Sequence, residues 1–172
     1  MTKTLDIVAK AFQPANLAKK ANELVEKIQK EKKTFKEASG ISDRMENEFY
    51  VLAKHYYDQG RYGEAVALFS ALSRINPTQY AYLYGLGSCY HQLKDYLNAS
   101  LGFYGAFSIN PEEPMTTYYL ADCFVHLGSK DDAVRFLDLT ISIAEAVNAQ
   151  QYASLTERCR LIKDKLKKET KS

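Results

Sequence analysis

Several features that would mark other classes of protein are scarce or missing in this chain of 172 residues. It has no tryptophan, only four prolines and only eight glycines, in an otherwise ordinary composition for one soluble globular domain. Its three cysteines are an odd number, which argues against a disulfide framework and favours buried, reduced thiols. No CxxC or HxxxH spacing indicates a metal site.

Long apolar runs are also missing. None approaches the roughly 20 residues that span a bilayer. The N-terminal stretch MTKTLDIVAKAFQPAN lacks an apolar core followed by a small-residue cleavage site, so it does not have the pattern of a signal peptide. We therefore expect a cytoplasmic protein without membrane insertion.

Charge is unevenly distributed along the chain. Residues 1–45 carry 10 basic and 6 acidic side chains (net +4), residues 46–149 carry 6 and 12 (net −6), and residues 150–172 carry 7 and 3 (net +4). A nucleic-acid-binding module concentrates Lys and Arg on its folded body. Here the body is acidic, which makes nucleic acid a poor candidate partner.

A repeat appears when the sequence is aligned with itself at an offset of 34 residues, without a gap from residue 46 to residue 145. Small residues recur at the eighth and twentieth positions of each unit, where they allow two helices to approach closely. They are Ala53, Gly87 and Ala121, and then Ala65, Ala99 and Ala133. The period and pattern are those of the tetratricopeptide repeat, and they predict an all-α solenoid of three repeats at 46–79, 80–113 and 114–149.

Turn residues divide each repeat into two helices. Gly60 and Gly128 suit a helix C-terminus, where glycine adopts a left-handed conformation at least cost, whereas Lys94 replaces glycine in the second repeat. Pro77 and Pro111 stop the second helix of their units. The predicted helices cover 46–59, 62–75, 80–93, 96–109, 114–127 and 130–148.

Both ends of the chain show helical patterns of their own. Residues 1–45 form a basic extension in which a stripe from Leu17 through Ala21, Leu24 and Ile28 to Phe35 predicts one helix over 17–36, followed by a hinge at 38–44. This extension is a candidate dimerisation element. Residues 150–172 carry a second stripe, which predicts a C-terminal capping helix and a frayed tail.

The sequence contains no recognisable catalytic motif. The sequence offers no Ser-His-Asp or Cys-His arrangement in a supporting context, no glycine-rich phosphate loop and no paired carboxylates. Gly102 and Gly105 fall inside a helix, where their small size for packing is the simpler explanation. We therefore expect a protein that is not an enzyme and needs no cofactor or metal.

Tyrosine is the unusual residue, with 13 copies, many of them in the first helices of the repeats. The fifth, ninth and twelfth positions of each repeat line the inner groove of such solenoids. These positions are Tyr50, Lys54 and Tyr57 in the first repeat, Tyr84, Ser88 and His91 in the second, and Tyr118, Asp122 and Val125 in the third. Tyrosine gives a large contact area and a hydroxyl group at low entropic cost, so the groove suits an extended apolar peptide.

Specific residues within the repeats resemble the type III secretion translocator chaperones of the SycD/LcrH-like class. The resemblance runs from Gly60-Arg61-Tyr62 to Ala133 and rests on a GLG-x-C stretch, a Tyr-x-x-Ala helix, a proline that opens the third repeat and a small-acidic-Cys step. These are Gly85-Leu86-Gly87 with Cys89, Tyr96 to Ala99, Pro114, and Ala121-Asp122-Cys123.

This resemblance implies a bacterial cytosolic chaperone that holds hydrophobic translocator proteins before export, by gripping an extended client segment in the groove. Ile75 and Phe103 match further apolar positions near the groove, whereas Lys54 stands where the family usually has an aromatic residue. The family often dimerises through its N-terminal region, which here is longer and more basic.

Two other functions fit the sequence to different degrees, and the first fits poorly. A clamp for the acidic tail of a heat-shock chaperone needs several basic and amide side chains in the groove, and of the corresponding residues only Lys54 could serve. The second alternative is a structural scaffold that acts through the outer face of the solenoid, and nothing in the sequence argues against it.

Overall fold

The structure is a computed structural model that describes residues 22–23, 25–28, 30–31 and 34–169. Within these ranges all regular secondary structure is helical, which confirms the predicted all-α fold. The chain divides into two compact units, the first ending at Glu46 and the second running from Asn47. None of the described helices is long and apolar enough to cross a membrane.

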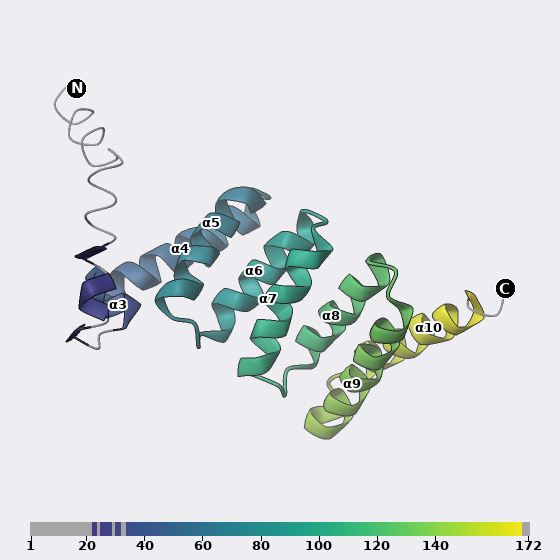
Figure 1. The fold of residues 1–172 in the computed structure, drawn as a ribbon. Helices are drawn as coiled ribbons and strands as arrows, with labels where there is room; N and C mark the ends of the chain where they lie inside the picture. The colour runs from purple at the N-terminus through teal and green to yellow at the C-terminus, as the bar shows by residue number, and fades with distance from the viewer. Residues whose placement is uncertain (1–21, 24, 29, 32–33, 170–172) are drawn as a thin grey trace. The chain divides into compact units, whose positions relative to one another are not determined.

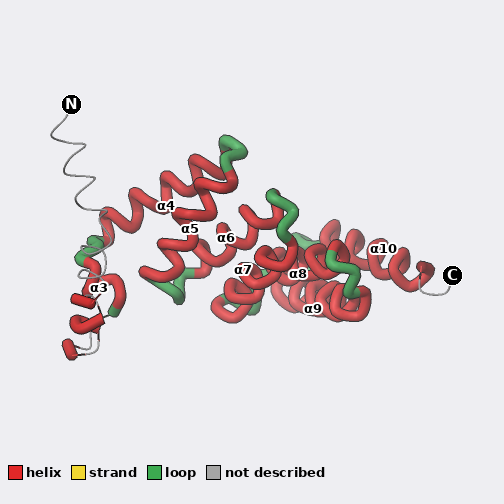
Figure 2. The backbone as a smooth tube through the Cα atoms, turned by 45° about the horizontal axis from the view of Figure 1, so that its top comes forward, coloured by secondary structure: helices red, strands yellow, loops and turns green. Residues whose placement is uncertain are grey.

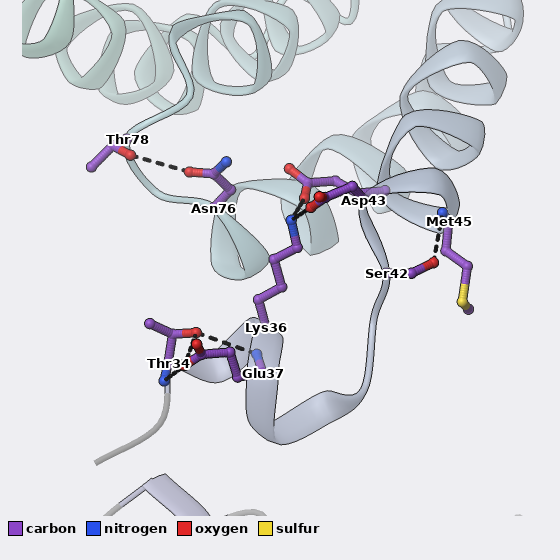
Figure 3. A network of polar contacts seen from close by, with 9 residues as sticks. Thr34, Lys36, Glu37, Ser42, Asp43, Met45, Asn76 and Thr78 are labelled. Carbon is purple, nitrogen blue, oxygen red and sulfur yellow. Dashed lines mark hydrogen bonds and ion pairs between the residues drawn. The ribbon is translucent and has the colours of Figure 1, made fainter.

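In the first unit the predicted single helix over 17–36 is wrong. Residues 22–23, 25–28 and 30–31 are helical, but Thr34 is extended (φ −64°, ψ 161°), and a new short helix, α3, covers Phe35–Ser39. The Thr34 hydroxyl accepts a hydrogen bond from the Glu37 backbone N–H (3.2 Å), and the Glu37 carboxylate accepts one from the Thr34 N–H (2.8 Å) (Figure 3). This capping box starts α3. The stripe positions Leu17, Ala21 and Leu24 lie outside the described residues.

The predicted hinge at 38–44 is shorter in the structure, because α3 extends to Ser39 and α4 (Asp43–Asp58) begins at Asp43. Gly40 closes α3 with a left-handed conformation (φ 69°). The Lys36 ammonium group donates to the Asp43 carboxylate and lies 2.6 Å from the buried Glu46 carboxylate (Figure 3). The hydrogen bond from Lys36 lowers the pKa of Asp43 below its ordinary range.

The second unit contains the repeats. From Asn47 onward α4 pairs with α5 (Tyr62–Ile75), α6 (Tyr80–Gln92) pairs with α7 (Tyr96–Ile109), and α8 (Pro114–His126) pairs with α9 (Lys130–Asn148), before α10 (Ala153–Glu169) follows. From α5 to α10 each helix contacts the next one along the chain, as Figures 1 and 2 show. The predicted boundaries of the six repeat helices agree with these bounds to within three residues.

Each repeat turns between its two helices through a residue with a left-handed backbone. Gly60 (φ 73°) and Gly128 (φ 76°) confirm the predicted helix ends. Lys94 adopts the same conformation (φ 61°) at the equivalent turn, and it is the only residue other than glycine with a positive φ in the described part of the chain. A side chain in this conformation costs about 1 kcal/mol or more, so the second repeat tolerates local strain here.

Small residues bring the helices of each repeat together. Ala53, Ala65, Ala99, Ala121 and Ala133 are fully buried. The helices α6 and α7 approach closely, because a Cβ atom added to Gly102 would lie 2.6 Å from the backbone nitrogen of Gly87 and 2.7 Å from its Cα. The expectation that Gly102 is small for packing therefore holds, and the same is true of Gly105, where an added Cβ would lie 3.1 Å from Leu83.

The last helix, α10, packs against α9 and carries two buried residues, Cys159 and Leu166, into the core of the third repeat. Two ion pairs reinforce this contact, one from Arg160 to Glu145 (2.9 Å) and one from Lys163 to Asp138. This arrangement is that of a capping helix with one apolar and one polar face.

Candidate peptide-binding groove

A tyrosine-rich pocket lies on the first helices of the repeats in the second unit. This first pocket has a volume of about 380 Å³. Its lining residues are Tyr50, Lys54, Tyr57, Asp58, Phe69, Tyr80, Ala81, Tyr84, Gly85, Ser88 and Tyr119. The five groove residues predicted for the first helices at this end, Tyr50, Lys54, Tyr57, Tyr84 and Ser88, are therefore brought together.

The floor of the first pocket is aromatic. The ring of Tyr50 meets that of Phe69 edge-on at 6.2 Å between centroids. The Phe69 ring packs against α6 at Gly85, where there is no side chain. A Cβ atom added to Gly85 would lie 2.5 Å from the Phe69 ring. Gly85 is therefore needed for the ring to lie under the pocket.

The walls of the first pocket combine rings with hydroxyl groups. Tyr80 and Tyr84 are stacked one helical turn apart (5.4 Å), and the Tyr80 hydroxyl is 2.8 Å from the Thr116 hydroxyl oxygen. Burial raises the pKa of Tyr57, Tyr80 and Tyr84, so these phenols stay neutral. Lys54 lies at the rim with its ammonium nitrogen 5.9 Å from the centre of the Tyr50 ring. The pocket offers neutral, apolar rings with few charges.

Between the second and third repeats the groove is filled by side chains. The His91 Nε2 atom lies 2.7 Å from the Asp122 Oδ2 atom, and the His91 ring meets that of Tyr119 at 5.5 Å. The hydrogen bond from His91 lowers the pKa of Asp122 despite its partial burial. His126 approaches the same carboxylate at 3.7 Å and stacks on Tyr96 at 4.1 Å. His91 and Asp122 therefore act as a bridge across the groove.

A second pocket of about 200 Å³ lies beyond this bridge. Its lining residues are Tyr118, Asp122, Val125, Leu137, Ile162, Lys165 and Leu166. The three groove residues predicted for the third repeat are gathered here rather than with the other five. The capping helix α10 supplies the opposite wall.

Two of the residues named from the resemblance lie beneath the surface. Phe103 is fully buried, stacked on Tyr119 at 5.2 Å, and Ile75 is also buried. Neither lines either pocket. Phe103 supports the ring of Tyr119, which lines the first pocket.

The sequence analysis missed several lining residues. Tyr80 and Tyr84 are four residues apart on one helix, so helical spacing could have identified Tyr80 as a neighbour on the same face. Tyr119 follows a predicted groove residue directly, and its ring packs against those of Phe103, Tyr84 and His91, contacts that the repeat pattern does not reveal. The α10 residues lie outside the repeat register, and no signal in the repeat pointed to them.

The paired helices, the 34-residue period and the pocket on the first helices define a tetratricopeptide-repeat solenoid. In agreement, the family model described as "Tetratricopeptide repeat" matches residues 50–104. No curated protein matches the chain by sequence. Within the described residues there is no group of three His, Cys, Asp or Glu side chains placed to hold a metal ion.

Solved structures of translocator chaperones share the fold. The type III secretion translocator chaperone SycD of Yersinia enterocolitica matches with a TM-score of 0.70 and 23% identity, over 77% of this chain and 90% of that chain. PcrH in complex with the chaperone-binding region of PopD matches with a TM-score of 0.69 and 24% identity, over 76% and 97%. A type III secretion complex from Aeromonas hydrophila gives 0.74 and 21%, over 86% and 97%. The chain therefore has the fold of the type III secretion translocator chaperones, as the motifs predicted.

Proposed function

We propose that this protein is a cytoplasmic bacterial chaperone for hydrophobic type III secretion translocators. It binds an extended apolar segment of its client in the groove of the repeats and keeps that client soluble before export. The observation that carries the proposal is the first pocket, in which neutral tyrosine rings surround a space of about 380 Å³. A pocket lined by such rings suits the apolar side chains of a peptide.

The structural neighbours support the class of client. SycD has been crystallised with a peptide of the translocator YopD, and PcrH with the chaperone-binding regions of PopD and PopB. These are properties of those proteins, and we extend them to this chain because its fold and its groove are compatible with such a ligand. SycD also crystallises as a dimer, and we propose that the basic N-terminal region of this chain has a role in self-association.

The lining also argues against other binding modes. Lys54 is the only basic side chain in the first pocket, whereas a clamp for an acidic tail needs several. The Ser88 hydroxyl in the first pocket donates to the Tyr84 carbonyl oxygen of its own helix (2.8 Å), and most of the lining is aromatic, so binding rather than catalysis is the proposed role of the pocket.

One observation favours the alternative of a scaffold that acts through its outer face. Leu97, Leu101 and Tyr104 lie along one face of α7 and are 61%, 65% and 58% exposed. The equivalent residues in the third repeat are Asp131, Arg135 and Asp138, so the stripe is confined to the middle of the array. An exposed apolar face of this kind is typical of a protein-binding surface.

A co-expression experiment separates the two functions. The full chain is co-expressed with the translocator proteins of the same bacterium, and the soluble translocator that co-purifies is measured. We expect Tyr57→Ala to reduce it about tenfold, because a buried aromatic contact at the centre of an interface contributes on the order of 1.4 kcal/mol or more.

Tyr104→Ala is the matched control, since it removes the same side chain from the outer face of α7. If Tyr104→Ala abolishes co-purification while Tyr57→Ala does not, the outer face is the working surface and the chaperone proposal is wrong. Thermal unfolding of both variants checks that each remains folded at the temperature of the assay.

A further inference from the structure

The second pocket is built from the same three repeat positions as the first. Tyr118, Asp122 and Val125 are the fifth, ninth and twelfth residues of the third repeat, and each lies two repeats after its counterpart Tyr50, Lys54 or Tyr57. Of the equivalent positions of the middle repeat, Tyr84 and Ser88 line the first pocket, whereas His91 lies 2.7 Å from Asp122, which lines the second. The contact between His91 and Asp122 thus separates the two pockets.

The capping helix closes the second pocket where a fourth repeat would otherwise stand. Ile162 and Leu166 of α10 face the pocket together with Leu137 of α9. Tyr118 is only 5% exposed, and burial raises the pKa of its phenol, so this wall stays neutral. These residues make an apolar interior.

The rim of the second pocket is basic on the α10 side. The α10 helix carries six basic and three acidic residues. Arg160 and Lys163 are paired with carboxylates of α9. The Arg158 guanidinium lies 5.3 Å from the centre of the Tyr118 ring and contributes to the lowered pKa of Asp122, the one carboxylate in the lining, whose main partner is His91. Lys165 lines the pocket and forms no ion pair with a described residue, so the rim on the α10 side is basic.

The volume of the second pocket indicates whether its ligand is a small molecule or one side chain of a peptide. Sites for small molecules typically have about 300–1,000 Å³, whereas this pocket has about 200 Å³. A single aliphatic or proline side chain fits such a volume. A carboxylate next to that side chain in the ligand would complement Arg158 and Lys165.

We propose that the second pocket is a second anchoring site for the same peptide, taking an apolar side chain that is flanked by an acidic residue. This inference rests on the proposed function, since it uses the groove as a peptide-binding surface. The two pockets approach each other at α8, where Tyr119 lines the first pocket and Tyr118 lines the second, so one extended peptide can reach both.

A random 16-residue peptide library displayed on phage tests this site without knowledge of the client. The library is selected on the full chain, and the selected peptides are synthesised with a fluorescein label for anisotropy titrations. We expect two apolar anchors in the selected peptides, with Asp or Glu beside one of them. A Val125→Glu variant should bind these peptides about 10- to 100-fold more weakly, which is the worth of one buried aliphatic side chain.

Charge reversal at the rim gives a second, milder variant. Lys165 is exposed, so Lys165→Glu should fold normally and weaken binding about two- to fivefold, and less at high salt. Lys167→Glu makes the same change on the same helix away from the pocket and should have no effect. Val147→Glu, at a half-exposed site on α9, is the corresponding control for Val125→Glu.

The outcomes separate the two proposals. If Tyr57→Ala weakens the selected peptides while Val125→Glu and Lys165→Glu bind them as tightly as the wild type, the second site is wrong and the proposed function stands. If no peptide is enriched, or if enriched peptides are insensitive to both Tyr57→Ala and Val125→Glu, the groove itself is not a peptide-binding surface and both proposals are wrong.

Discussion

The groove is filled between the second and third repeats and open on either side of that point. In the middle, His91 is hydrogen-bonded to Asp122 and Tyr84 meets Tyr119, whereas the flanking intervals hold pockets of about 380 and 200 Å³. The repeat positions are the same in all three intervals. The difference shows that the period sets where a pocket can form, and that particular side chains decide whether it does.

The same contrast continues behind the groove. The middle repeat has a close helix contact at Gly87 and Gly102, whereas the first repeat has Gly63 in open space on α5. We expect the filled groove and the close helix contact to make the middle repeat the most stable part of the second unit.

The largest expected effect comes from breaking the tight helix pair. Gly102→Ala places a Cβ atom 2.6 Å from backbone that cannot move aside, so α6 and α7 must separate. We expect the free energy of unfolding to fall by about 3 kcal/mol, measured by urea denaturation. Gly63→Ala is the control, and it should stabilise the protein by up to about 1 kcal/mol because glycine is a poor helix former. Equal effects of the two substitutions would contradict the contrast.

The next largest effect on stability is expected from removing the hydrogen bond between His91 and Asp122. Asp122→Asn takes away a charged hydrogen bond to His91, and we expect a loss of about 1–2 kcal/mol at pH 7, with Asp164→Asn as a control on exposed α10. Because folding lowers the pKa of Asp122, its contribution is fully present above the ordinary carboxyl pKa and is lost as the pH falls through the lowered value. The stability difference between wild type and variant should therefore shrink in acid below about pH 4. A difference that persists there would mean that the carboxylate charge is not responsible.

A smaller effect on the free energy of unfolding is expected from relieving the backbone strain at Lys94 in the middle repeat. Lys94→Gly relieves a left-handed backbone and should raise the free energy of unfolding by about 1 kcal/mol. The reverse change in the equivalent turn of the first repeat, Gly60→Lys, should lower it by a similar amount. Urea denaturation of the pair, with unchanged slopes, provides the comparison. If Lys94→Gly has no effect, the turn carries no strain.

The smallest change is a difference in reactivity among the three cysteines. All are free and fully buried, and burial raises the pKa of Cys89 and Cys123 to about 12 and that of Cys159 to about 11. We expect no rapid reaction of the native protein with Ellman's reagent, and three reactive thiols in urea. In dilute urea Cys159 on the terminal helix should react before Cys89 of the middle repeat. The opposite order would place the least stable part in the middle.

Much of the fold could be predicted from the sequence, because small residues and turn residues repeat every 34 positions and each helix depends on its immediate neighbours. The helix start at Thr34 could not be predicted, because the apolar stripe favours one continuous helix over 17–36 and the capping box favours a new helix at Thr34. Both signals are local, so the sequence does not rank them. The separation of the groove into two pockets depends on contacts between repeats, such as His91 with Asp122, which no single repeat encodes. The wall formed by α10 was missed because that helix lies outside the period.

The central claim is that the client binds on the first helices of the repeats rather than on the outer face. A photo-crosslinking amino acid at Lys54, on the rim of the first pocket, and the same amino acid at Leu101, on the outer face of α7, report on the two surfaces in the living bacterium. Mass spectrometry of the crosslinked products is the measurement. The account predicts a translocator protein crosslinked from position 54 and not from position 101, and a translocator crosslinked only from position 101 would contradict it.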